Sequence, residues 1–177
     1  MVFENGVNLR GTRGGGTVAV NVPGTKPSRD DMSRWPWDVG TLPPPRIPLE
    51  RTFEGFLGLR WIELSADSAL VRFDVRDDLM QPLGLLHGGI YAAVAETVAS
   101  VATVRAVWRD GLTGSGLSNS ASFLRPVTSG TIEVAARLRH KDEREWFWSH
   151  EFRDAESRIC ALVDVVIAVR RVASPSR

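Results

Sequence analysis

One acidic residue, Glu96, stands alone in a long apolar segment. It is the only charged side chain between His87 and Arg105, and alanine and valine surround it on a helix predicted over residues 90–108. A carboxylate in such surroundings is poorly hydrated, which favours a role as a general base or a nucleophile. A carboxylate on a partly exposed helix face would instead be expected to have a charged partner nearby, and this segment offers none. Glu96 is therefore our candidate catalytic carboxylate.

Ser100 follows Glu96 by four residues, one helical turn further on. Side chains with this spacing lie next to each other on a helix, so the serine hydroxyl can donate a hydrogen bond to the carboxylate or to a water that it holds. The spacing predicts a Glu96–Ser100 pair.

Gly88 and Gly89 open this helix, directly after His87. The first backbone N–H groups of a helix have no partner within it and lie at the positive end of the helix dipole. A thioester carbonyl oxygen placed there would be polarised, and glycine allows it to approach closely. Two glycines before a helix are also ordinary turn residues, and His87 can equally be a loop histidine whose ring bonds a backbone carbonyl.

Other kinds of catalytic site find little support in the sequence. His140 and His150 lack the spacing of a zinc motif, and Cys160 has no second thiol with which to bind a metal or form a disulfide. Residues 114–116, Gly-Ser-Gly, are too short for the Gly-x-Ser-x-Gly motif of serine hydrolases and are predicted to form a turn. Cys160 lies in an apolar run, where it is expected to be a small buried hydrophobe. No metal ion or redox cofactor is predicted.

The composition is that of one ordinary domain preceded by an arm. The 177 residues are 43% hydrophobic and 24% charged. Residues 1–48 hold seven of the ten prolines and a Gly-Gly-Gly run, and such a segment cannot supply a packed core. We expect this arm to be partly disordered, or docked on the domain or on a second subunit through Trp35 and Trp37. The folded domain is predicted over residues 49–177.

Charge and hydropathy exclude several partners. The 22 basic and 21 acidic residues give a net charge of +1, so no broad field would attract the protein to nucleic acid or to an anionic membrane. The N-terminus lacks the basic-then-apolar pattern of a signal peptide, which predicts a cytoplasmic location. Residues 90–108 are apolar enough to be mistaken for a membrane span, but the central Glu96 favours a buried helix of a water-soluble protein.

The elements predicted around this helix are mostly strands, because apolar residues alternate with polar ones. An antiparallel sheet must then cover the apolar helix, which is an α+β arrangement. In chain order we expect a short helix over 49–56, a hairpin of strands 57–64 and 69–76, a loop over 77–86, the long helix, turn residues over 110–115, and strands around 132–138, 146–151 and 159–169.

The stretch QPLGLLHGGIYAAVAETVAS, residues 81–100, strongly resembles the hotdog-fold thioesterases of the PaaI-like and hydroxybenzoyl-CoA thioesterase group, in the branch with glutamate on the central helix. The resemblance continues in SFLRPVTSG, residues 122–130, and in the strand pattern out to Val169. It implies a hotdog fold, in which a curved antiparallel sheet wraps around the helix. It also implies a homodimer with two active sites at the interface, which could pair further into a homotetramer. The arm lies outside the resemblance.

The resemblance implies a role for each matching residue. Glu96 matches the carboxylate that acts as a general base on water or attacks the thioester carbon itself, and the choice between the two stays open. Gly88 matches the donor of the N–H that binds the carbonyl oxygen. Gln81 matches a residue thought to orient the substrate or the water, His87 one that supports the loop and the carbonyl, and Ser100 the hydroxyl one turn beyond the carboxylate.

The resemblance also implies how coenzyme A would bind, as part of the substrate and not as a separate cofactor. Phe123, Leu124 and Arg125 would line the passage for the pantetheine arm, and Gly89 would lie beside the thioester. Arg125 and Arg144 are candidates for binding the phosphates, because arginine can hold a phosphate through two parallel hydrogen bonds. For Arg144 a solvated surface charge is an equal alternative.

The function expected from these residues is hydrolysis of an acyl-CoA thioester to a free acid and coenzyme A. One alternative is a hydratase or dehydratase of the same fold, although its histidine and acid are expected at a different spacing. Another is a non-catalytic acyl-CoA sensor with an added DNA-reading segment, but the arm shows neither a two-helix pattern nor a dense basic patch. The six tryptophans indicate an apolar interior without identifying the acyl group.

Overall fold

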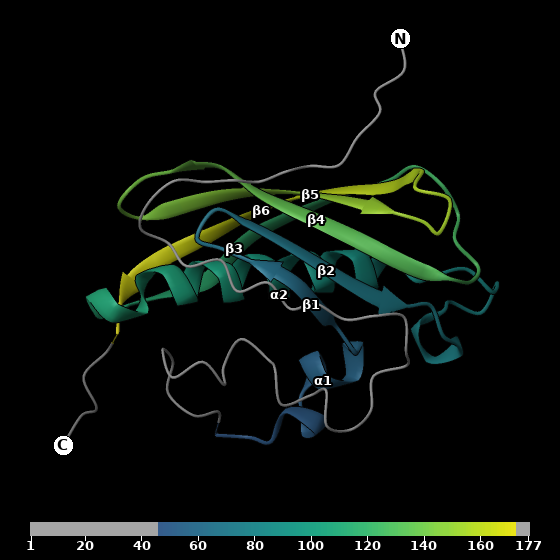
Figure 1. Ribbon diagram of the computed structural model, residues 1–177, viewed down its shortest axis with the longest axis horizontal. Helices are drawn as coiled ribbons and strands as arrows, with labels where there is room; N and C mark the ends of the chain where they lie inside the picture. The colour runs from purple at the N-terminus through teal and green to yellow at the C-terminus, as the bar shows by residue number, and fades with distance from the viewer. Residues whose placement is uncertain (1–45, 173–177) are drawn as a thin grey trace, which may run out of the picture.

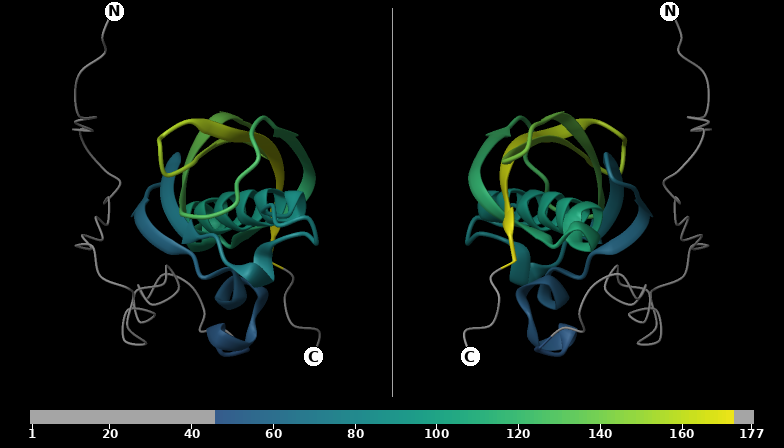
Figure 2. Two further views of the ribbon diagram at one scale, coloured as in Figure 1. Left: turned by 90° about the vertical axis from the view of Figure 1, so that its right-hand side faces the viewer. Right: turned by 90° about the vertical axis from the view of Figure 1, so that its left-hand side faces the viewer.

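A long helix, α2 (Gly88–Val107), runs through the middle of the molecule with a six-stranded antiparallel sheet curled over it (Figure 1 and Figure 2). This computed structural model describes residues 46–172. The other elements are η3 (Leu49–Arg51), α1 (Phe53–Leu57), β1 (Arg60–Leu64), β2 (Ser68–Asp74), η4 (Asp77–Leu79), η5 (Trp108–Asp110), β3 (Leu112–Phe123), β4 (Thr131–Lys141), β5 (Glu145–Arg153) and β6 (Ile159–Arg171). The predicted α+β hotdog arrangement is confirmed. The predicted arm, with Trp35 and Trp37, lies outside the described residues except for residues 46–48.

The strands follow the order β1-β2-β4-β5-β6-β3, and every neighbouring pair is antiparallel. Figure 2 shows β1 and β2 at one margin of the curled sheet and β3 at the other. Because β3 is an edge strand, one row of its backbone N–H and C=O groups has no strand beside it within residues 46–172.

The apolar residues that alternate with polar ones in the sequence lie on the inner face of the sheet. On β2, Val71 and Phe73 are fully buried, and on β4 the buried side chains include Ile132 and Val134. These side chains point toward α2, which supplies the other wall of the core. Burying an apolar side chain of this size contributes roughly 1.5–3 kcal/mol, so the sheet and the helix depend on each other for stability.

The apolar character of α2 is explained by its position in the core. The segment Gly88–Asp110 is long and apolar enough to cross a membrane, but it is mostly buried, as in the core helix of a soluble protein. One specific bond joins this helix to the sheet, since the buried Trp148 indole donates to the Thr103 hydroxyl at 2.9 Å. The arrangement agrees with the expectation of a buried helix.

Strand β3 corrects one prediction. The turn expected over residues 110–115 is shorter, because β3 already begins at Leu112 and contains both Gly114 and Gly116. A Cβ on Gly114 would lie 2.9 Å from Cγ2 of Ile167, and one on Gly116 would lie 2.9 Å from Oε1 of Glu96. These glycines are therefore strand residues that let β3 lie close to α2, and the turn reading missed this close packing.

A bulge divides β3 into two halves. The register with β6 shifts between Gly116 and Ser118, so Leu117 is an extra residue in the strand. Before the bulge Gly114 and Gly116 face α2; after it Asn119 bonds to α2 and Phe123 packs on the start of α2. A strand that alternates strictly could not place residues 116 and 119 on one face, so the bulge keeps both halves in contact with the helix.

The first described helices differ slightly from the prediction. Phe53 and Phe56 stack at 6.0 Å on α1, as the expected short helix requires, although both rings are exposed. The Arg76 guanidinium covers the Phe56 ring at 5.0 Å. The first strand begins at Arg60 rather than at Leu57, because Gly58 ends α1 with a left-handed backbone conformation.

Candidate functional site

His87 is the N-cap of α2, and its side chain decides which helical N–H remains available. The His87 Nδ1 accepts a hydrogen bond from the Gly89 N–H at 2.9 Å, and the His87 backbone N–H donates to Leu79 O. The Gly88 N–H has no hydrogen-bond partner within residues 46–172. Of the two glycines predicted to meet the substrate, Gly88 therefore offers a free donor, while the donor of Gly89 is used by the cap.

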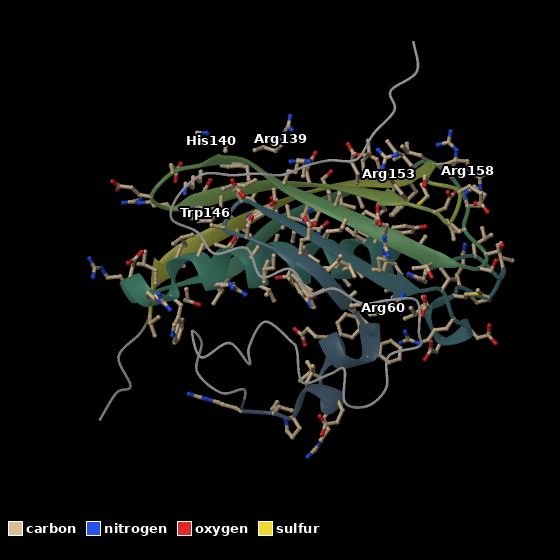
Figure 3. All side chains as sticks on the ribbon, viewed as in Figure 1. Arg60, Arg139, His140, Trp146, Arg153 and Arg158 are labelled. Atoms are coloured by element: carbon tan, nitrogen blue, oxygen red, sulfur yellow. The ribbon has the colours of Figure 1, made fainter. Side chains whose placement is uncertain are left out.

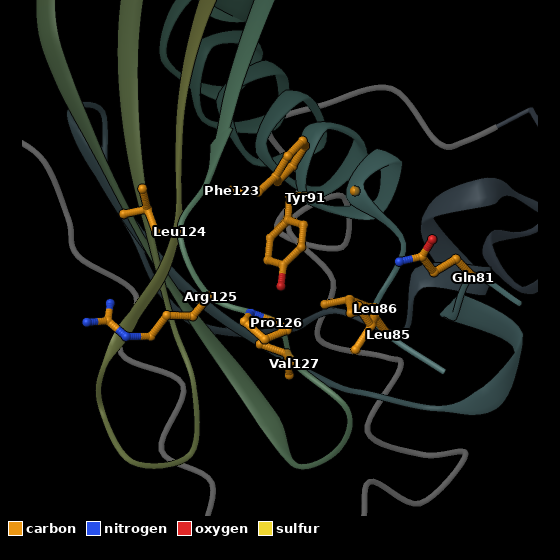
Figure 4. A pocket seen from close by; sticks show the side chains of 10 residues that line it. Gln81, Leu85, Leu86, Tyr91, Phe123, Leu124, Arg125, Pro126 and Val127 are labelled. Atoms are coloured by element: carbon orange, nitrogen blue, oxygen red, sulfur yellow. The ribbon is translucent and has the colours of Figure 1, made fainter. Parts of the chain in front are cut away.

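A pocket of about 280 Å³ opens at this end of α2. It brings together five of the ten predicted site residues, from the loop before α2, the start of α2, and the end of β3 with the segment after it (Figure 4). The lining consists of Gln81, Leu85, Leu86, Gly88, Tyr91, Phe123, Leu124, Arg125, Pro126 and Val127.

The pocket has an open rim and an enclosed floor. Phe123 and Leu124 are 58% and 51% exposed, whereas Leu86, Tyr91 and Val127 are buried. The Phe123 ring lies against the start of α2, where a Cβ on residue 88 would meet its Cζ at 3.0 Å. Glycine at 88 thus leaves room both for this ring and for a ligand atom at the free N–H.

Tyr91 was not predicted as a site residue, yet its side chain forms part of this pocket. Its ring lies 5.7 Å from the ring of Phe123 and meets Phe152 edge-on at 5.2 Å. Figure 4 shows its hydroxyl pointing toward Pro126. Burial raises the pKa of the Tyr91 phenol, and the neighbouring Cys160 raises it further. A tyrosine three residues after the helix start was the signal available in the sequence, because such residues lie one turn apart on the same side.

Glu96 and Ser100 form the predicted pair. The Ser100 hydroxyl donates to Glu96 Oε1 at 2.8 Å, and the carboxylate lies over Gly116 of β3. Both side chains are partly exposed, so the carboxylate is on an open face of α2 and not deep in the core. The Glu96–Ser100 hydrogen bond is thus made within one chain, and both side chains face the surface of that chain.

Strand β3 runs antiparallel to α2 along this open face. Phe123 packs against Gly88, and Gly116 packs against the Glu96 side chain. Between them, the Asn119 Nδ2 donates a hydrogen bond to Ala92 O at 2.9 Å. The helix residues in these contacts are four residues apart, and Ser100 continues the row. The result is a row of small and polar residues on α2, Gly88, Ala92, Glu96 and Ser100, bordered by the edge strand.

A single chain does not bring the two predicted reacting groups together. Glu96 follows Gly88 by eight residues, which corresponds to about 12 Å along a helix axis. A carboxylate and an oxyanion donor that act on one carbonyl must each be about 3 Å from the reacting atoms. Within one chain, the pocket at Gly88 and the Glu96 carboxylate therefore do not meet.

The two predicted phosphate ligands lie in different places. Arg125 is at the rim of the pocket, where its guanidinium donates to Ile159 O at 2.6 Å. Arg144 is in the turn between β4 and β5, where its carbonyl accepts a hydrogen bond from the Val169 N–H. Val169 lies ten residues beyond Ile159 on β6, so the two arginines are anchored roughly 30 Å apart along this strand. Figure 3 shows His140 and Trp146, which flank this turn, at the opposite end of the sheet from Arg153 and Arg158. The structure does not bring Arg144 to the pocket of its own chain.

The remaining candidate residues are parts of the core. Cys160 is fully buried, as expected, and its thiol donates to Phe152 O at 3.3 Å. His150 is buried on β5 with Nδ1 3.1 Å from Val163 O, and burial lowers its pKa to about 4. Among residues 46–172, no three His, Cys, Asp or Glu side chains are grouped as a metal site requires.

Comparison with known proteins places this architecture among thioester hydrolases. The model of the thioesterase superfamily matches residues 83–161. A Mycobacterium tuberculosis protein named as an esterase is 35% identical over 111 residues, covering 62% of this chain and 79% of that protein. Its solved structure has a TM-score of 0.65 with 31% identity, covering 69% of this chain and 98% of the other.

Two further relatives carry more specific names. A solved thioesterase of Haemophilus influenzae has a TM-score of 0.66 with 26% identity, covering 75% of this chain and 97% of that one. The 1,4-dihydroxy-2-naphthoyl-CoA hydrolase of Listeria monocytogenes is 24% identical over 115 residues, which is 65% of this chain and 93% of the relative.

Proposed function

Because the chain belongs to the thioesterase superfamily and is a thioester hydrolase, we propose that it hydrolyses acyl-CoA, with Glu96 as the reacting carboxylate. The observation that carries this proposal is the Glu96 carboxylate, bonded to Ser100 at 2.8 Å on an open face in a helix without another charged residue before Arg105. The named substrate of the Listeria monocytogenes relative, a CoA thioester, supports the substrate class.

The proposed reaction uses groups that the chain already positions. The thioester carbonyl oxygen accepts a hydrogen bond from the Gly88 N–H, which stabilises negative charge as the carbonyl carbon is attacked. Glu96 either takes a proton from the attacking water or attacks the carbon itself, and Ser100 holds the carboxylate in place. The carbon–sulfur bond then breaks, and coenzyme A leaves as the thiolate, which takes up the proton that Glu96 removed from the water. After direct attack, water instead hydrolyses the mixed anhydride at Glu96, which releases the acid and supplies the proton for the thiolate. Gln81 reaches the same pocket and is suited to orient the substrate.

We further propose that each site is completed by a second copy of the chain. The separation of about 12 Å between Gly88 and Glu96 requires the donor and the carboxylate to come from different copies. If α2 of the partner lies antiparallel, its Gly88 can lie beside Glu96 while its Glu96 lies beside Gly88. The two-fold axis then passes near Ala92, midway between them, and generates two identical sites.

The open face fits such a partner. Ala92 and Ala93 are small, which allows close approach of a second helix, and both are only partly buried in one chain. Among residues 46–172, the neighbouring β3 has a free edge of 12 residues with Leu117 exposed, and pairing with a second β3 would satisfy its backbone groups. The proposed dimer therefore covers the edge strand and completes the sites at once. We propose that it works in the cytoplasm.

The role of Glu96 is tested by the Glu96→Gln variant, assayed by thiol release with a panel of acyl-CoA thioesters. Loss of a general base or nucleophile should lower kcat by about 100-fold or more while substrate binding is retained. Glu63→Gln is the matched control, because Glu63 is an exposed carboxylate on β1, at the far margin of the sheet. Hydrolysis by Glu96→Gln within about tenfold of wild type, ~1.4 kcal/mol in the barrier, would refute the assignment.

A further inference from the structure

Tyr91 differs from the other polar side chains of the pocket. Of the three polar residues among the described lining, Gln81 and Arg125 are accessible at the mouth, whereas Tyr91 is only 3% exposed. Its ring is fixed between Phe123 and Phe152, so the hydroxyl has a defined position. A polar group held among buried apolar side chains in the enclosed part of a pocket is the usual means by which a binding site fixes a ligand's orientation.

The two ends of the pocket suit different parts of a thioester. Coenzyme A is too large for 280 Å³ and must extend toward the open rim at Phe123, Leu124 and Arg125. With the carbonyl oxygen at the Gly88 N–H, the acyl group is then directed to the enclosed end. That end is formed by buried side chains, among them Tyr91.

The Tyr91 hydroxyl can act as a donor to such a ligand. Burial raises the pKa of the phenol, so the group keeps its proton at neutral pH. Its neighbour Cys160 offers only a sulfur, which is a weak acceptor and whose own proton is directed to Phe152 O. An oxygen atom on the ligand would be a better partner for this buried hydroxyl than the thiol.

We propose that Tyr91 is a specificity-determining residue that selects acyl groups carrying an oxygen acceptor, such as a hydroxyl, keto or ether oxygen, remote from the thioester. This inference rests on the proposed acyl-CoA hydrolysis and extends it from the reaction to the substrate class. A site that donates a hydrogen bond to its substrate discriminates against the analogue that lacks the acceptor, because the buried donor then has only the weak sulfur acceptor of Cys160.

The test compares wild type with Tyr91→Phe, which removes one oxygen and keeps the ring against Phe123 and Phe152. Substrates are matched pairs of CoA thioesters that differ by one oxygen: benzoyl with 4-hydroxybenzoyl, and hexanoyl with 6-hydroxyhexanoyl. Wild type should prefer the oxygenated member of at least one pair in kcat/KM by about tenfold. Tyr91→Phe should lose this preference, because kcat/KM for the oxygenated member should fall about tenfold more than kcat/KM for the plain member.

Cys160→Ala is the matched control, because it removes the sulfur beside the Tyr91 hydroxyl. This variant should keep the preference for the oxygenated substrate. Affinities for non-hydrolysable thioether analogues of the same pairs, measured by calorimetry, separate this inference from the proposed reaction. Wild type that binds oxygenated analogues preferentially, through Tyr91, but hydrolyses nothing would support Tyr91 and refute the reaction. Equal preferences in wild type and Tyr91→Phe, or no preference in wild type, would overturn the role of Tyr91 even if hydrolysis is found.

Discussion

The two sides of α2 contrast sharply. The side under the sheet is closed by the chain's own residues: Trp148 bonds Thr103, and Phe152 packs on Tyr91. The side along β3 carries Glu96 and Ser100 in the open, two helical turns from the Gly88 N–H that the same reaction needs. One side of the helix is thus complete in a single chain, whereas the other side holds the groups that we propose belong to two shared sites.

This contrast teaches which substitutions should affect stability and which should affect activity. Changes beneath the sheet disturb packing or leave buried polar groups unpaired, so they should act on the free energy of unfolding. Changes on the open side meet few atoms of their own chain and should act on hydrolysis and assembly. Three predictions test this division, beginning with the largest effect.

The largest effect is expected from mixing two inactive variants, Glu96→Gln and Gly88→Val. Each alone should lose roughly 100-fold or more in activity, since one lacks the carboxylate and the other blocks the oxyanion donor. If the sites combine Glu96 of one copy with Gly88 of the other, a mixed dimer contains one site with neither substitution. Refolding the two variants together at equal amounts should therefore restore about one quarter of wild-type activity, measured by thiol release.

The outcome distinguishes shared sites from sites within one chain. If both groups came from one chain, every site in the mixture would carry one substitution and no activity would return. Each variant refolded by itself is the control. Activity that stays at the level of the separate variants, in a mixture shown to contain mixed dimers, would disprove the two-copy site.

The covered side should show a pH-dependent stability through His150. Burial lowers its pKa from 6.5 to about 4, so between these values the unfolded chain binds a proton that the folded chain does not. Stability from this group is complete above about pH 6.5 and is lost as the pH falls toward 4, by roughly 3 kcal/mol in total. Urea unfolding of wild type across this range measures the slope.

His150→Leu should remove this part of the pH dependence, because no imidazole remains to be protonated in the unfolded chain. His140→Gln is the control, since His140 is an exposed histidine on β4 and its replacement leaves the core unchanged. An unchanged slope in His150→Leu would mean that the covered side does not hold a neutral histidine.

The smallest effects on stability and activity are expected from replacing two glycines on β3, which allow the two sides of α2 to be compared within one strand. In Gly114→Ala the new methyl group meets Ile167 and Thr103 beneath the sheet, so stability should fall by about 1–2 kcal/mol. In Gly116→Ala it meets the carboxylate of Glu96, a flexible side chain that can move aside. Stability should then change little, while kcat falls about tenfold or more because the carboxylate is displaced.

Thermal unfolding and thiol release on both variants check this pair. The reverse result, with Gly114→Ala impairing only catalysis and Gly116→Ala only stability, would show that the two sides are not divided as described.

Local patterns were enough to predict most of the fold. The alternation at Val71 and Phe73 predicted β2, and the four-residue spacing of Glu96 and Ser100 predicted a hydrogen bond that the structure contains. Both rest on regular repeats, in which neighbours along the chain fix the direction of a side chain. The pocket residue Gln81 was identified through resemblance, whereas Gly88 was identified from its position at the start of the helix.

What could not be predicted depends on contacts between distant segments. Gly114 and Gly116 have the composition of a turn, and it is pairing with the distant β6 that makes them strand residues. Tyr91 was not predicted as a site residue, because the rings that hold its side chain, Phe123 and Phe152, come from β3 and β5, far along the chain. Arg144 was grouped with the pocket by chemical type, but the β4–β5 turn places it at the other end of the sheet.

Because of the bulge at Leu117, the number of residues in β3 determines the shape of the pocket. Because the extra residue restores contact with α2 after Gly116, the number of residues between Gly116 and Phe123 fixes which way the Phe123 ring points. A deletion of one residue here would keep every other side chain, but it would turn the Phe123 ring away from the pocket and toward the outer surface of the sheet. In related proteins, a gap or insertion in this strand would therefore carry more meaning than a change of residue type.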